Sequence, residues 1–201
     1  MPKANIDISI ARGQGKSLTG EGLESATLEV MIPSSSAAMV IDIESDNKTR
    51  TLQDLRVIVK KHGGNVTPTA FMFTRLGRSV LQSKDPDYDF DDVFLQAVDM
   101  GAEDVEQDDQ GNAVVWTQPS ATHQVAQKLA SSFKMEILSS DIIYSPTAEK
   151  ARVDDAEVAT GLGSFLSAVR DLPEVQAVYA NLERGAVSED LWKPIEEDLD
   201  S

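Results

Sequence analysis

The stretch SDNKTRTLQDLRVIVKKHGGN, residues 45–65, is the segment from which the fold can be worked out. It follows an apolar run, begins with polar residues and ends at two glycines. Apolar residues recur within it at helical spacing and predict one buried stripe: Leu52, Leu55, Ile58 and Val59. Gly63 supplies the left-handed position that ends many helices, and Gly64 frees the exit of the chain. The stretch therefore predicts a polar loop followed by an amphipathic helix.

The predicted helix begins near Thr51, because Asp54 follows three residues later with the spacing of a capping box. Residues 45–51 then form the loop from a strand end into the helix N-terminus. Backbone N–H groups at such an N-terminus can bind an anion such as phosphate. Lys60 and Lys61 lie in the last turn, where cations complement the helix dipole.

Strands are predicted on both sides of this segment. Two β-rich runs, 27–33 and 37–44, are separated by the turn PSSS and are expected to be neighbouring strands. The residues after the segment alternate between strand and helix patterns: strands at 69–77 and 79–84, a helix at 91–101, a hairpin around DQGN at 109–112, a helix at 121–133, a strand at 135–146, a helix at 154–172 and a strand at 175–182. Residues 79–147 therefore have the β-α-β-β-α-β order of a ferredoxin-like domain.

The predicted fold class is α+β, with two α/β domains. A ferredoxin-like domain at 79–148 is inserted into a discontinuous domain formed by 24–78 and 149–184. Residues 1–23 are expected to be the remnant of a helical domain and a connector, and 185–201 a loose acidic tail. In the helix at 154–172, Gly161 and Gly163 are expected to permit close helix packing.

Composition limits the function. The 201 residues carry a formal net charge of −16 and no cysteine, which excludes disulfides and thiolate metal sites and fits a reducing interior compartment. No run of about 18 apolar residues occurs, so no membrane span is predicted. The two histidines lie in different predicted domains, and no nucleophile elbow is present. We therefore predict no catalytic residue, no metal and no cofactor, and we do not expect an enzyme.

The charge is unevenly distributed. Residues 48–84 contain eight lysines or arginines and one acid, whereas 85–114 contain eleven acids and no base. A basic face on an acidic body is compatible with nucleic-acid binding, since phosphate contacts need Lys and Arg. The alternative is that these charges only solvate the surface and cap the helix. The residues predicted to contact RNA or the ribosome are Ser45, Asp46, Asn47, Lys48, Thr49, Arg50, Thr51, Lys60, Lys61, Gly63, Gly64, Asn65, Arg75 and Arg78.

Four ordered motifs resemble the YebC/PmpR family: SDNKTRT at 45–51, KKHGGNV at 60–66, MGAEDVEQDDQG at 100–111 and LPEVQAVYANLE at 172–183. The resemblance implies a helical N-terminal domain followed by two α/β domains, one inserted in the other. By the same resemblance, this chain looks truncated at the N-terminus and lacks the family's basic first region and any targeting segment. IPSSS at 32–36 and VTPT at 66–69 depart from the usual family turns and favour a mitochondrial-type member.

The resemblance implies a translational activator that binds the ribosome and rRNA or mRNA and supports mitochondrial synthesis of a respiratory-chain subunit. The full-length protein is then expected in the mitochondrial matrix, with a bacterial-type cytoplasm as the alternative. A DNA-binding transcriptional regulator is the first alternative function, and a protein-interaction scaffold is the second. The sequence leaves the oligomeric state open.

Overall fold

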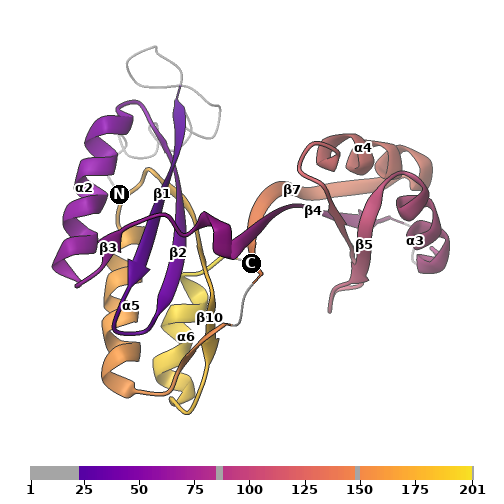
Figure 1. Cartoon of the computed structure of the whole chain (residues 1–201). Helices are drawn as coiled ribbons and strands as arrows, with labels where there is room; N and C mark the ends of the chain where they lie inside the picture. The colour runs from indigo at the N-terminus through magenta and orange to yellow at the C-terminus, as the bar shows by residue number, and fades with distance from the viewer. Residues whose placement is uncertain (1–22, 85–87, 148–149, 201) are drawn as a thin grey trace, which may run out of the picture. The chain divides into compact units, whose positions relative to one another are not determined.

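The chain is described by a computed structural model that covers residues 23–84, 88–147 and 150–200 (Figure 1). It divides into two compact units. Of the described residues, the first unit comprises those up to Phe73 and from Pro146 onward, and the second those from Thr74 to Ser145. The predicted remnant of a helical domain, apart from Leu23, lies outside the described residues.

The first unit is built on a four-stranded antiparallel sheet. Its strands, in spatial order, are β3 (Asn65–Val66), β1 (Glu24–Ile32), β2 (Ala37–Ser45) and β9 (Val175–Ala180). The expectation that 27–33 and 37–44 are neighbouring strands is confirmed, since β1 and β2 pair along their whole length. Alternate residues of β1 point to one face, and Leu28, Val30 and Ile32 are buried there.

Three helices share one buried core with this sheet (Figure 1). They are α2 (Lys48–Lys61), α5 (Ala156–Arg170) and α6 (Glu189–Glu197). Leu55 and Val59 of α2 and Phe165 of α5 belong to that core. Because the inner stripe of α2 is held against the sheet, its opposite face is turned to solvent.

The predicted strand at 175–182 is divided by Asn181 into β9 and β10 (Leu182–Arg184). The side chain of Asn181 is buried, and its Oδ1 accepts the Ala38 amide at 2.7 Å. Its own carbonyl accepts the Ala151 amide at 2.6 Å. The chain thus leaves β2 at this residue and pairs in parallel with β8 (Ala151–Val153), forming a separate two-stranded sheet.

The prediction of a loose tail at 185–201 is wrong, because residues 189–197 form α6 and pack on the core. Trp192 and Ile195 are buried, and Leu199 packs against the same cluster. Asp200 accepts the Val178 amide at 2.7 Å and pairs with Arg170 at 2.5 Å. Apolar residues recur every three to four positions in this segment, but the many acids of its exposed face led to the prediction of a loose tail.

The second unit has the β-α-β-β-α-β order (Figure 1). Its elements are β4 (Phe73–Ser83), α3 (Phe90–Asp99), β5 (Ala102–Gln107), β6 (Ala113–Thr117), α4 (Thr122–Phe133) and β7 (Met135–Pro146). The strands lie in the order β5-β6-β4-β7, and the helices α3 and α4 share one core with the sheet. Val93 and Ala97 of α3 are fully buried in it.

The prediction of two strands at 69–77 and 79–84 is wrong. A single strand, β4, follows a short 3-10 turn at Ala70–Met72. Gly77 does not mark a turn: it pairs with Thr117 of β6, and a Cβ there would come 1.8 Å from Thr122 Oγ1. The glycine permits close approach of α4 to the strand, and the second unit accordingly begins at Thr74 rather than at residue 79.

Among the described residues, the helices are all too short or too polar to cross a bilayer.

The packing of α6 predicts the effect of a core substitution. Ile195→Ala should lower the free energy of unfolding of the first unit by about 2–5 kcal/mol, because it removes a fully buried side chain. Urea unfolding followed by the fluorescence of Trp192, in a Trp116→Phe background, would measure it, since the chain has two tryptophans. Lys193→Ala, at an exposed site, should change stability by less than about 0.5 kcal/mol. Equal effects of the two substitutions would contradict the packed α6.

Candidate nucleic-acid interface

The helix α2 begins at Lys48, one turn before the predicted start. Asn47 is the residue that caps it, because its Oδ1 accepts the Arg50 amide at 3.1 Å. The predicted capping box at Thr51 is therefore wrong. The Thr51 hydroxyl lies 2.8 Å from Ser45 Oγ, which also accepts the Asn47 amide at 3.0 Å. Asn47 is thus the N-cap of α2, and asparagine is one of the residue types preferred at that position.

This arrangement removes two residues from the predicted contact surface. Ser45 and Thr51 are buried, and their hydroxyl groups bond to each other. They fix the passage from β2 into α2 and are not accessible to a nucleic acid. Asn47, Lys48, Thr49 and Arg50 are exposed, but Lys48, Thr49 and Arg50 belong to the first turn of the helix rather than to a loop.

The positive charges at the start of α2 are matched by acids. Lys48 Nζ lies 3.4 Å from a carboxylate oxygen of Glu24. The Arg50 guanidinium lies 3.9 Å from Asp46 and 3.5 Å from Glu174. These carboxylates compete with any phosphate for the two cations. The N-terminal end of α2 is therefore a poorer anion site than its sequence indicates.

The other end of α2 has the predicted geometry. Lys60 and Lys61 lie in the last turn, and Gly63 has a φ of 75°, the left-handed conformation that glycine adopts without strain. Gly64 is buried, and a Cβ there would lie 2.7 Å from Ile32 Cδ1. Gly64 therefore serves close packing, whereas Gly63 and Asn65 are exposed.

The predicted site residues do not form one patch. Thr51 and Lys60 are nine residues apart in α2, so the nearer ends of the clusters at 45–51 and 60–65 lie about 14 Å apart along the helix axis, at about 1.5 Å per residue. Arg75 and Arg78 belong to the second unit and lie in a strand. Their guanidinium groups lie over aromatic rings of the same unit, Arg75 at 5.6 Å from the Tyr144 centroid and Arg78 at 5.8 Å from that of Trp116.

The structure adds residues that the sequence analysis missed. Arg56 and Val57 are exposed on α2, one helical turn before Lys60 and Lys61. We define the outer face of α2 as the exposed residues Gln53, Arg56, Val57, Lys60 and Lys61. Within the described part of the chain, no carboxylate lies within ion-pair distance of Arg56, Lys60 or Lys61. The spacing of four residues between Arg56 and Lys60 could have indicated from the sequence that both lie on one face of the helix.

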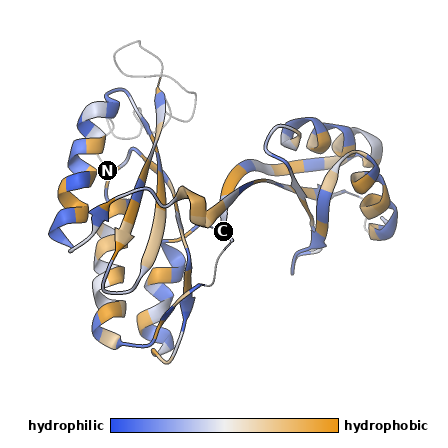
Figure 2. Cartoon of the chain, in the orientation of Figure 1, coloured by the Kyte–Doolittle hydropathy of each residue, from blue (hydrophilic) through white to orange (hydrophobic). Residues whose placement is uncertain are grey.

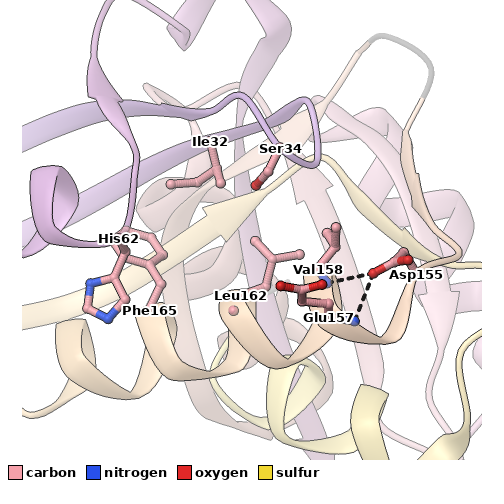
Figure 3. A pocket seen from close by; sticks show the side chains of 9 residues that line it. Ile32, Ser34, His62, Asp155, Glu157, Val158, Leu162 and Phe165 are labelled. Atoms are coloured by element: carbon pink, nitrogen blue, oxygen red, sulfur yellow. Dashed lines mark hydrogen bonds between the residues drawn. The ribbon is translucent and has the colours of Figure 1, made fainter.

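A cavity of about 490 Å³ lies beside the C-terminal end of α2 (Figure 3). Its walls are formed by Ile32, Ser34, His62, Asp155, Glu157, Val158, Gly161, Leu162 and Phe165. The His62 and Phe165 rings lie 5.7 Å apart, and Asp155 caps α5 by accepting the amides of Glu157 and Val158. His62 itself is held by a 2.9 Å contact of Nδ1 with the Ile58 carbonyl.

The two glycines of α5 differ in their surroundings. A Cβ on Gly163 would lie 4.0 Å from Ile195 of α6, which is ordinary van der Waals contact. A Cβ on Gly161 would meet nothing within 4 Å, so the expected close packing at that position is wrong. Gly161 instead leaves the cavity wall open. In the residues that are described, no group of three or more His, Asp or Glu side chains is placed to hold a metal ion.

Comparison with known proteins identifies the family. A family model described as the second and third domains of TACO1/YebC matches residues 23–182. This chain belongs to that family. A probable transcriptional regulatory protein of Persephonella marina is 35% identical over 186 residues, which cover 91% of this chain and 72% of the relative. A protein of the same description from Ralstonia nicotianae is 34% identical over 189 residues, covering 90% of this chain and 73% of the relative.

A solved structure has a similar fold. The crystal structure of a conserved hypothetical protein from Aquifex aeolicus matches with a TM-score of 0.64 and 28% identity, covering 92% of this chain and 74% of that one. The YebC/PmpR resemblance and the α+β class with two α/β domains are thus confirmed. The mitochondrial subtype stays a prediction.

The cap of α2 can be tested by substitution. Asn47→Ala should lower the free energy of unfolding of the first unit by about 1 kcal/mol, because it removes the side-chain acceptor for the Arg50 amide. Asp54→Ala, at the acid of the predicted capping box, should have little effect because that residue is exposed and inside the helix. Urea unfolding would measure both variants. A larger loss of stability in Asp54→Ala than in Asn47→Ala would instead support a helix that begins at Thr51.

Proposed function

We propose that this chain regulates gene expression without catalysis, by binding nucleic acid through the outer face of α2. The observation that carries the proposal is the set of three exposed cations on α2, Arg56, Lys60 and Lys61, which have no carboxylate of the described chain within ion-pair distance. Cations in such a position are available to displace counterions from phosphate groups. Gln53 on the same face can donate to phosphate or sugar oxygens.

The proposal separates the basic residues into two groups. Lys48 and Arg50 are paired with acids and contribute little to phosphate binding. Arg56 and Lys60 lie four residues apart, about one helical turn, so that both can reach one sugar–phosphate backbone. The outer face of α2 offers few cations and the whole chain has a net charge of −16, so this face alone binds nucleic acid weakly. A second surface or a partner is therefore expected to contribute to binding.

Two finer functions compete within this proposal. The names of the relatives from Persephonella and Ralstonia favour a transcriptional regulator, which would bind DNA. The family resemblance implies instead a translational activator that binds ribosomal RNA or mRNA. A few phosphate contacts from one helix face suit either ligand, since such contacts carry no sequence information. The bacterial relatives support a bacterial-type cytoplasm, and the mitochondrial matrix stays a prediction.

The outer face of α2 can be tested against a matched control in the same helix. Arg56→Gln/Lys60→Gln should weaken nucleic-acid binding at all salt concentrations and reduce the slope of log affinity against log salt by about 1–2. Lys48→Gln should leave both nearly unchanged, because Glu24 already pairs with Lys48. Glutamine has a helix propensity close to that of lysine and arginine, so the helix is preserved.

The probes are salt-washed ribosomes, a structured ribosomal RNA fragment and a DNA duplex of equal length, each titrated across a salt series. Preferential binding to ribosomes or RNA selects the translational function, and a sequence-specific footprint on DNA selects the transcriptional one. If the double variant binds every probe as well as the unsubstituted chain, the outer face of α2 is not the contact surface. If no probe binds, the nucleic-acid proposal is wrong.

A further inference from the structure

The helix α3 in the second unit contains several hydrophobic residues (Figure 2), and three of them are exposed. Phe94 is 38% exposed, Leu95 62% and Val98 45%. Phe94 and Val98 are four residues apart, and Leu95 and Val98 three, so the three side chains are neighbours on one face of the helix. We name them the α3 patch. A contiguous apolar group of this kind is typical of an interaction surface rather than of scattered surface residues.

The fold of the second unit does not need the α3 patch. Val93 and Ala97 form the inner face of α3 and are fully buried in the core that this helix shares with the sheet and α4. Phe94, Leu95 and Val98 do not belong to that core. Between 38% and 62% of each residue therefore stays in contact with water in the folded unit.

Acids surround the α3 patch. Asp89 caps the helix, Asp91 and Asp92 lie in its first turn, and Asp99 is its last residue. The first three complement the positive end of the helix dipole, but Asp99 lies at the negative end, where a carboxylate is unfavourable. No lysine or arginine occurs in the helix. Asp99 therefore does not stabilise α3 through the helix dipole, and its carboxylate adds to the negative charge beside the α3 patch.

We propose that the α3 patch docks into an apolar groove with a basic rim on a protein of the ribosome. This inference rests on the translational form of the proposed function. An apolar helix face with anchors at i, i+1 and i+4 has the form of a helix that binds in a groove. Its acidic border is complementary to lysine and arginine on the partner and repels phosphate, so this surface contacts protein and not RNA.

The two surfaces then have separate partners. The outer face of α2 meets RNA, and the α3 patch meets basic protein. Both kinds of surface are present in a ribonucleoprotein particle, and the linkage of two weak contacts in one chain raises the overall affinity. A second copy of the chain is a less suitable partner for the patch, because each copy carries a net charge of −16.

The test compares two matched substitutions of exposed leucines in the second unit. Leu95→Gln removes the centre of the α3 patch without changing charge, and Leu138→Gln does the same on β7, where the leucine is 49% exposed. Binding of the full chain to salt-washed ribosomes is measured by co-sedimentation, with circular dichroism as the folding control. Leu95→Gln should weaken binding by about fivefold or more, whereas Leu138→Gln should leave it unchanged.

A photo-crosslinking residue at position 95 identifies what the patch touches on the ribosome. The inference expects an adduct that proteinase removes and ribonuclease does not, at a lysine- or arginine-rich segment of a ribosomal protein, and no such adduct from position 138. An adduct with ribosomal RNA, or one with twice the mass of this chain, would overturn it. Ribosome binding that needs Arg56 and Lys60 but not Leu95 would overturn this inference and leave the proposed function standing. If the unsubstituted chain does not bind ribosomes at all, this inference and the translational form of the proposed function are both overturned, and the DNA-binding form is left standing.

Discussion

Burial of the inner stripe of α2 against the sheet is the constraint on which the candidate interface depends. Leu55 and Val59 are fixed in the core that α5 and α6 complete, so the helix can present only one set of side chains to solvent. Asn47 at one end and Gly63 at the other set where that surface begins and ends. The positions of Arg56 and Lys60 follow from packing rather than from any contact they make themselves, which leaves their charged groups available.

Basic side chains at the two ends of α2 differ in how available they are to bind phosphate. Lys48 and Arg50 lie beside carboxylates from β1, the preceding loop and the segment before β9, elements that meet only in the folded chain. An exposed ion pair contributes little to stability, but it keeps a cation occupied and lowers the local potential. Counting lysines and arginines along the sequence therefore overstates the phosphate-binding capacity of residues 45–51, and it does not distinguish Arg56 from the paired cations.

The elements with strong periodicity could be predicted from sequence: the paired strands β1 and β2, the helix α2 with its glycine exit, and the β-α-β-β-α-β order of the second unit. The misses have local causes. A break between two strands was predicted after Gly77 because the group that requires glycine there, the Thr122 hydroxyl, lies in a helix far along the chain. The acids around Trp192 and Ile195 suggested a solvated tail, although the apolar spacing was present. The cap at Asn47 was missed because two capping signals overlap within five residues.

An acidic body need not oppose binding to a ribonucleoprotein. Repulsion between phosphate and a chain of net charge −16 suppresses indiscriminate adsorption, so that binding occurs only where the outer face of α2 meets phosphate at short range. At such range the contact acts within the screening length of about 8 Å at physiological salt, whereas the repulsion from the remainder of the chain is largely screened. The acids of the second unit then favour a basic protein surface over nucleic acid. Charge segregation between the units would thus direct each to a different component of the same target.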